Sequence, residues 1–378
     1  MNARMKFFVA LAMIVLGVAV FQKLSTDFKN FKAEDAALGV DTVAINDHWN
    51  DYSLTPSFFD TVTKETSNKK LALILGASQL HSINEYVQGQ HLAVTYANQS
   101  SQSRNSSVRY MQLTQPNGSF HDLLGLYLCY KKPGVKQPKL LIVALVYDDL
   151  IEDLKDTVAE CLPSANPKLQ KVAGKGYEQL YELRKAYEKK IKDEKTAKQA
   201  EVAALDYSLS AQDKLERGIS NFLEKNWEAY RYRGNLYSKV VYELYSFALY
   251  YISGLSKRRG PTAPENLKQW NLEALYSLIR IAKADGSKVL IYRQPHRPGE
   301  VPFYHDRAEY DRFYSELEAY AALEGVLITD FETIVSQDLW GMNGWNFPDV
   351  FHFKNRGHEI LGKALDGFVE KQEKTHAL

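Results

Sequence analysis

The sequence has few of the features that indicate common classes of binding site. Its 378 residues include only two cysteines, Cys129 and Cys161, and their spacing fits no metal site. No group of histidines, cysteines and carboxylates has metal-ligand spacing, and no glycine-rich phosphate loop occurs. The net charge of +1 gives no overall electrostatic case for nucleic acid. We therefore expect no metal, no cofactor and no nucleic-acid partner.

The two cysteines leave two interpretations open. They can form a disulfide in an exported protein, or they can be two unrelated buried thiols. The rest of the composition, 45% hydrophobic and 25% charged, is typical of a globular chain. Such a chain buries a substantial core as one large domain or two smaller ones.

The first 30 residues differ from the rest. Arg4 and Lys6 precede an uninterrupted apolar run over 7–21, and Lys23 follows it. This is the pattern of a targeting or anchoring helix, and the bulky residues after position 20 favour an uncleaved anchor over a removed signal peptide. Because the positive charges precede the helix, we expect the body of the protein outside the cytoplasm, anchored in a bacterial inner membrane.

A strand and its exit organise the remaining sequence. The run over 71–75 is apolar and predicts a buried strand, and Gly76-Ala77-Ser78 then provides a tight turn. Open α/β sheets bind ligands at the carboxyl ends of their strands, which is where this turn places Ser78. A serine hydroxyl becomes a nucleophile only when a histidine takes its proton and a carboxylate orients that histidine.

The other periodic segments alternate between strand and helix. The patterns predict strands at 91–96, 140–146, 288–292 and 326–328, and helices at 78–86, 121–130, 267–284, 309–324 and 357–371. A Ser-, Asn- and Gln-rich stretch between Asn98 and Ser119 predicts a loop. Residues 175–225 are dense in Lys, Glu, Ala and Leu and predict long solvated helices.

This alternation indicates one doubly wound domain that is interrupted by helices. We expect a signal anchor at 1–30, a stalk and packing segment at 31–68, the first part of the domain at 69–161, a helical insertion at 162–262 and the second part at 263–378.

A histidine and a carboxylate with suitable spacing occur late in the chain. Asp349 stands three residues before His352, in an expected loop ahead of the final helix. At that spacing both side chains can face one pocket, so that the aspartate accepts from one ring nitrogen while the other faces Ser78.

A Gly-x-Ser turn after the first strand and a late Asp-x-x-His together resemble the SGNH/GDSL hydrolase family. The resemblance covers about residues 70–160 and 265–370 and implies a flavodoxin-like parallel sheet with helices on both faces. Its nearest members are membrane-anchored and extracytoplasmic: the accessory proteins of alginate O-acetylation and the D-alanyl transfer protein of teichoic-acid modification. The resemblance implies that Ser78 is the nucleophile, His352 the general base and acid, and Asp349 its orienting partner.

The resemblance also implies donors for the oxyanion of the reaction. The backbone amide of Ser78 is one, and Gly118 occupies the place of the family's glycine. Where the family has an asparagine, this chain has Asp148, and an ionised carboxylate cannot donate. Asn105 or Asn117 are candidates to complete the site instead.

Three further residues are candidates for substrate binding. His81 lies one helical turn after Ser78, and Arg293 and Arg297 end a strand at the same expected edge, where they can bind an acidic sugar or phosphate polymer. A solvated turn shaped by two prolines explains the arginines equally well.

Two hypotheses for the function follow. The first is an extracytoplasmic serine esterase or O-acyltransferase that acts on acyl groups, acetyl foremost, of a cell-envelope or exported polysaccharide. The second is a catalytically weak scaffold of the same fold that uses its helical insertion to bind a membrane acyltransferase.

Overall fold

The computed structural model describes residues 42–44, 59, 64, 66–131, 134–150, 152, 156–208, 220, 222–223, 225–227, 230, 265–298, 307–343 and 347–375. The chain forms two units, Met1–Val40 with Lys190–Ser253 and Asp41–Lys189 with Gly254–Leu378. The expected anchor over 7–21 and most of the expected stalk lie outside the described residues. Among the helices that are described, none is long and apolar enough to cross a membrane.

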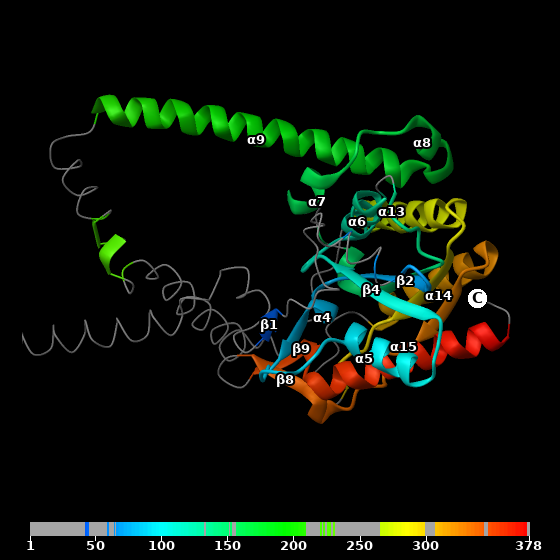
Figure 1. Cartoon of the computed structure of the whole chain (residues 1–378). Coiled ribbons are helices and arrows are strands. Elements are labelled where there is room, and N and C mark those ends of the chain that lie inside the picture. The colour runs from blue at the N-terminus through cyan, green and yellow to red at the C-terminus, as the bar shows by residue number, and fades with distance from the viewer. Residues whose placement is uncertain are drawn as a thin grey trace, which may run out of the picture. The chain divides into compact units, whose positions relative to one another are not determined.

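The second unit is built on a five-stranded parallel sheet (Figure 1). Its strands are, in spatial order, β4 (Val108–Thr114), β2 (Lys70–Gly76), β5 (Leu140–Leu145), β6 (Lys288–Arg293) and β7 (Leu327–Asp330). Renumbered by position in the chain, this order is 2-1-3-4-5, the flavodoxin-like order. The expectation of an α/β fold with a flavodoxin-like parallel sheet is confirmed.

The central strands are buried on both faces, which explains their continuous apolar sequences. All six residues of β5 are buried, and in β2 only Lys70 is exposed. A parallel sheet needs helices on both of its faces to reach this state.

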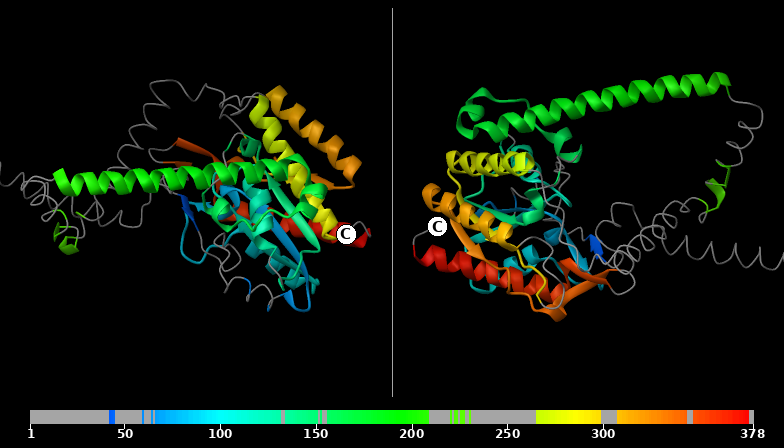
Figure 2. Two further views of the ribbon diagram at one scale, coloured as in Figure 1. Left: turned by 90° about the horizontal axis from the view of Figure 1, so that it is seen from above. Right: turned by 180° about the vertical axis from the view of Figure 1, so that it is seen from behind.

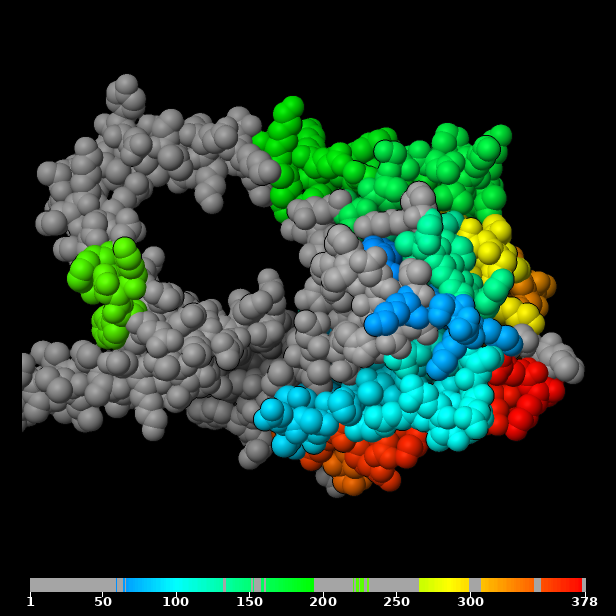
Figure 3. All heavy atoms as spheres, viewed as in Figure 1, coloured from blue at the N-terminus to red at the C-terminus, as the bar shows by residue number. Residues whose placement is uncertain are grey.

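Two layers of helices supply that cover. Helices α6 (Phe120–Tyr130) and α13 (Glu265–Ala284) cover one face, and α5 (Ala93–Ser103) and α15 (Asn355–Lys374) cover the other (Figure 1). Helix α14 (Arg307–Glu324) lies beside α13 (Figure 2). The rings of Tyr276 on α13 and Tyr320 on α14 stack with their centroids 3.9 Å apart. Helices α5 and α15 lie against each other (Figure 3) because Gly362 has no side chain: a Cβ there would be 2.3 Å from the Ala93 carbonyl oxygen.

Smaller elements surround the sheet. They are β1 (Thr42–Ala44) paired with β3 (Ser82–Asn84), β8 (Trp340–Asn343) paired with β9 (Phe347–Phe353), and the short helices α4 (Ser78–His81), η1 (Tyr147–Leu150), α7 (Asp156–Cys161), α8 (Pro167–Ala173) and η4 (Gln337–Leu339). The long helix α9 (Lys175–Ser208) is divided between the two units after Lys189. The sheet unit includes residues up to Lys189, so the start of the expected insertion at 162 belongs to it.

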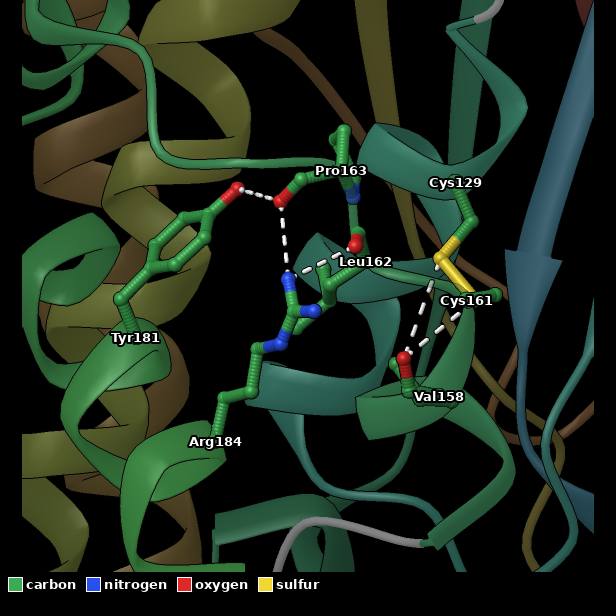
Figure 4. Close-up of a disulfide and its surroundings, with 7 residues drawn as sticks. All are labelled: Cys129, Val158, Cys161, Leu162, Pro163, Tyr181 and Arg184. Atoms are coloured by element: carbon green, nitrogen blue, oxygen red, sulfur yellow. Dashed lines mark hydrogen bonds between the residues drawn. A yellow bond between two sulfur atoms is a disulfide. The ribbon is translucent and has the colours of Figure 1, made fainter. Parts of the chain in front are cut away.

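The two cysteines form a disulfide that joins the end of α6 to the end of α7 (Figure 4). The Cα atoms of Cys129 and Cys161 are 5.6 Å apart. Just beyond the bridge, Tyr181 of α9 donates to the Pro163 carbonyl at 2.9 Å, and Arg184 donates to the Leu162 carbonyl at 2.7 Å. The bridge and these bonds fix α7 and the start of α9 on the sheet unit.

Several predicted elements are wrong. The segment 91–96 begins helix α5 instead of forming a strand, and the expected loop over 98–119 contains strand β4. The helix expected over 78–86 stops at His81 and continues as β3. Residues 349–352 lie on β9 rather than in a loop.

Candidate active site

Ser78 is the first residue of α4, directly beyond the carboxyl end of β2. In this strand order the crossovers reverse direction between β2 and β5, and that switch point is where such sheets bind ligands. Gly76 makes the sharp exit possible, since a Cβ there would lie 2.8 Å from Leu80 and 2.9 Å from Ala144. The half-buried Ser78 therefore stands at the binding edge with its amide in a position that has no intrahelical acceptor.

The structure brings Ser78 together with His352 and Asp349. The Nε2 atom of His352 is 3.1 Å from Oγ of Ser78, and Nδ1 is 3.0 Å from Oδ2 of Asp349. Because a carboxylate only accepts, Nδ1 carries the proton and donates to Asp349, which leaves Nε2 to accept from the Ser78 hydroxyl. This is the geometry in which a histidine can take the proton of a serine.

Asp349 is held as a carboxylate although it is fully buried. Its Oδ1 accepts from the backbone amides of Phe351 at 2.8 Å and His352 at 2.9 Å, and its Oδ2 also accepts from Asn84 Nδ2 at 2.7 Å. Burial alone would raise the pKa of Asp349, but the charge and side-chain hydrogen bond of His352 and the backbone amides of Phe351 and His352 together lower it below its usual value. The ionised group can orient His352 and stabilise its protonated form.

Asn84 is a site residue that the sequence did not reveal. It lies on β3, a three-residue strand, and its side chain faces the backbone of Gly341 on β8, where a Cβ would be 1.8 Å from Asn84 Cγ. Its contact with Asp349 spans 265 residues of chain. The local sequence carries no signal for this contact, because neither the burial of Asn84 nor its approach to Asp349 can be read from its neighbours in the chain.

Two side chains attach β9 to the rest of the site. Gln79 donates from Nε2 to the carbonyls of Pro295 at 2.9 Å and Phe351 at 2.8 Å. Arg297 donates from one guanidinium nitrogen to the carbonyls of Gly341 at 2.8 Å and Asp349 at 3.0 Å. The structure therefore places Arg297 beside the predicted triad, with part of its guanidinium bonded to the backbone of β8 and β9.

Arg293 lies in an ion-pair network. Its guanidinium is 3.0 Å from Glu332 and 3.1 Å from Asp330, and it stacks over the ring of Tyr314 at 3.9 Å. Nearby carboxylates occupy the donors with which it was expected to bind an anionic polymer.

The expected oxyanion donors lie near Ser78, but they are poorly suited to donate. The turn over 115–118 is beside the exit of β2, since the Gln115 amide donates to the Gly76 carbonyl at 3.1 Å. The Gly118 amide, however, donates to the Gln115 carbonyl at 3.0 Å, and Asn117 is an exposed residue with a φ of 51°. Asp148 lines a small cavity together with Gln79 and Phe351.

His81 is buried close to the other site residues. Its Nδ1 is 3.3 Å from the Thr114 hydroxyl. Burial and the nearby His352 lower the pKa of His81 to about 4, so its ring is neutral at physiological pH.

No family model matches the sequence, and no curated protein is detectably similar to it. Solved structures do give matches. A GDSL-like lipase from Bacteroides thetaiotaomicron shares 11% identity over 85% of this chain and 99% of its own, with a TM-score of 0.34. Est24, a carbohydrate acetylesterase from Sinorhizobium meliloti, shares 12% identity over 80% of this chain and 99% of its own, with a TM-score of 0.32. With TM-scores this low, the similarity to these structures is no evidence for the activity of this protein.

Proposed function

We propose that this protein is a serine esterase or O-acyltransferase of the SGNH/GDSL type. The observation that carries the proposal is the chain of two hydrogen bonds from Ser78 through His352 to the buried carboxylate of Asp349. The position of Ser78 beyond β2, at the switch point of a flavodoxin-like sheet, supports the same proposal.

The reaction proceeds in two halves. Oγ of Ser78 attacks the carbonyl carbon of an acyl ester while Nε2 of His352 takes its proton, and Asp349 stabilises the resulting imidazolium. The tetrahedral intermediate collapses, the proton passes from His352 to the leaving oxygen, and an acyl-serine remains. Water or a sugar hydroxyl then loses a proton to His352 and attacks the acyl-serine. The bond between the acyl group and Oγ breaks, and His352 returns the proton to Ser78.

We further propose that the substrate is an acyl-bearing polysaccharide, with acetyl the expected group, of the cell envelope or of an exported polymer. The protein would act from the outer side of a bacterial inner membrane, held by the expected anchor at 7–21, and a membrane-bound acyltransferase would be a possible source of acyl groups. The disulfide between Cys129 and Cys161 supports this location, since disulfides persist in oxidising compartments.

Labelling with a serine-reactive fluorophosphonate tests the proposal. We expect the wild-type protein to form a covalent adduct and to hydrolyse p-nitrophenyl acetate. Ser78→Ala abolishes labelling, His352→Ala slows it by roughly 1,000-fold or more, and Ser103→Ala, a change at an exposed serine of α5, alters neither reading. Absence of labelling in the wild type, or unchanged labelling in Ser78→Ala, would refute the proposal.

One observation favours the scaffold alternative. The Gly118 amide already has an acceptor and Asp148 is a carboxylate, so two expected oxyanion donors are missing. A Ser78→Ala chain that fully restores polymer acylation in cells lacking the natural protein would establish the scaffold instead.

A further inference from the structure

The acyl carbonyl oxygen needs more donors than the Ser78 amide. As this oxygen becomes an oxyanion, each donor aimed at it contributes strongly to the rate. The neighbouring turn does not supply one from Gly118, and the end of β5 presents Asp148. A donor must come from another element at the same edge of the sheet.

Gln294 directly follows β6 at that edge. Its backbone amide donates to the Leu145 carbonyl at 3.1 Å, which fixes it beside the end of β5. Its side chain runs back across β5 toward β2, since a Cβ on Gly76 would be 3.5 Å from Nε2 of Gln294 and 2.9 Å from Ala144. The amide group thus lies under the turn that presents Ser78.

The neighbours of Gln294 connect it to the nucleophile from a second direction. Gln79, the residue after Ser78, donates to the carbonyl of Pro295, the residue after Gln294. Gln79, Gln294, Asp148 and Phe351 line one cavity, and Phe351 is the residue before His352. The lining of this cavity therefore includes Gln79 and Phe351, the chain neighbours of Ser78 and His352.

The side-chain amide of Gln294 is buried and unsatisfied. Its exposed fraction is 4%, and neither its oxygen nor its nitrogen has a hydrogen-bond partner among the described residues. Buried polar atoms are nearly always paired, and an unpaired one is destabilising. An unpaired buried amide beside the turn that presents Ser78 indicates a partner that arrives with the ligand.

We infer that Gln294 is a catalytic residue whose Nε2 donates to the acyl carbonyl oxygen of the substrate, in place of the asparagine that Asp148 replaces. This inference rests on the proposed function. It requires no change in the proton transfers, because the amide donates without losing its proton.

Substitutions at Gln294 and at a matched glutamine test the inference. Gln294→Met keeps the approximate shape and removes the donor, and Gln294→Leu is a second variant without it. Gln137→Met is the control, since Gln137 also has a buried unpaired oxygen but precedes β5 at the opposite edge. We expect both Gln294 variants to lower kcat on p-nitrophenyl acetate by about 100-fold with KM nearly unchanged. Fluorophosphonate labelling of these variants should be slower but reach the wild-type end point, and the control should match wild type.

A pH profile separates donation from a structural role. Gln294→Glu has a donor only while the new carboxyl is protonated, so its kcat relative to wild type should be higher at pH 5.5 than at pH 8.5. Three outcomes would overturn the inference while leaving the proposed function intact. They are a wild-type kcat in both Gln294→Met and Gln294→Leu, a reduced labelling end point in both variants, and a ratio of Gln294→Glu kcat to wild-type kcat that does not change with pH. Failure of the wild type itself to label would instead refute the proposed function.

Discussion

Asn84 gives the sharpest test of how Asp349 is held. Its Nδ2 donates to Oδ2 of Asp349 at 2.7 Å. The same oxygen accepts the hydrogen bond from Nδ1 of His352. A hydrogen bond to a charged acceptor contributes roughly 1.5–3 kcal/mol. Asn84→Ala removes this hydrogen bond from the transition state, in which Asp349 must stabilise the imidazolium of His352. The loss of roughly 1.5–3 kcal/mol there lowers kcat by roughly 10- to 150-fold.

Gly341→Ala reaches the same bond from the opposite strand. The added Cβ would lie 1.8 Å from Asn84 Cγ, so the asparagine must leave its place beside Asp349. We expect a loss of kcat at least as large as that of Asn84→Ala, because the added Cβ would also lie 2.3 Å from the Cβ of Asn84. The double variant should be no worse than Gly341→Ala alone, since the asparagine has already left its place in that variant. Gly367→Ala on α15 is the matched control, since a Cβ there meets nothing within 4 Å.

The assay is steady-state hydrolysis of p-nitrophenyl acetate, normalised to active sites by fluorophosphonate titration. An Asn84→Ala enzyme within threefold of wild type would refute the assigned role of the asparagine. Losses that multiply in the double variant would show that Gly341→Ala acts by another route.

Three further predictions concern stability, each measured by urea unfolding. Burial lowers the pKa of His358 to about 3, so below pH 6.5 the unfolded chain binds a proton that the folded protein does not. The contribution of His358 to the free energy of unfolding is present above pH 6.5 and is lost as the pH falls toward 3. We expect a loss of about 2 kcal/mol between pH 7 and pH 5, which should be absent in His358→Gln. If the free energy of unfolding of His358→Gln fell by the same amount as that of wild type, the assignment would be contradicted. Changing both Cys129 and Cys161 to serine opens a loop of 32 residues and should lower the free energy of unfolding by about 3.7 kcal/mol. A decrease of less than about 1 kcal/mol would count against the disulfide. Ser119→Ala removes the capping box that Ser119 forms with Asp122 at the start of α6, at a cost of about 1 kcal/mol, whereas no change would mean that the cap is dispensable.

The sequence predicted those strands and helices whose pattern of apolar residues fits only one type of secondary structure. The apolar runs at 71–75 and 140–146 are long enough to be central strands, and the helices at 267–284 and 357–371 have clear apolar faces. The six residues at 91–96 alternate as a strand does, but the helical continuation through Ala97 to Ser103 decides their conformation.

Strand β4 shows a different limit. Arg109 and Gln112 made the segment 108–114 look like part of a polar loop, yet all seven of its residues are buried. Gln112 is accommodated because its amide donates to the Leu80 carbonyl at 2.8 Å. Such a partner, 32 residues away in the chain, has no signature in the local pattern.

The same distinction applies to the site. The proximity of Ser78, Asp349 and His352 could be predicted from the sequence because Gly-x-Ser and Asp-x-x-His are short motifs of known chemistry. Asn84 and Gln294 could not, since their significance depends on which atoms of distant strands they approach in the folded protein.

The hydrogen bond between Ser78 and His352 joins residues that are 274 positions apart. At the usual rate of translation, roughly 5–20 residues per second, about 15 to 55 s separate the synthesis of the serine from that of its histidine. During that interval the nascent chain carries Ser78 without the histidine to which its hydroxyl is hydrogen-bonded in the folded protein. The contact between Ser78 and His352 therefore forms near the end of synthesis, when β9 reaches a sheet that the earlier residues have begun to build.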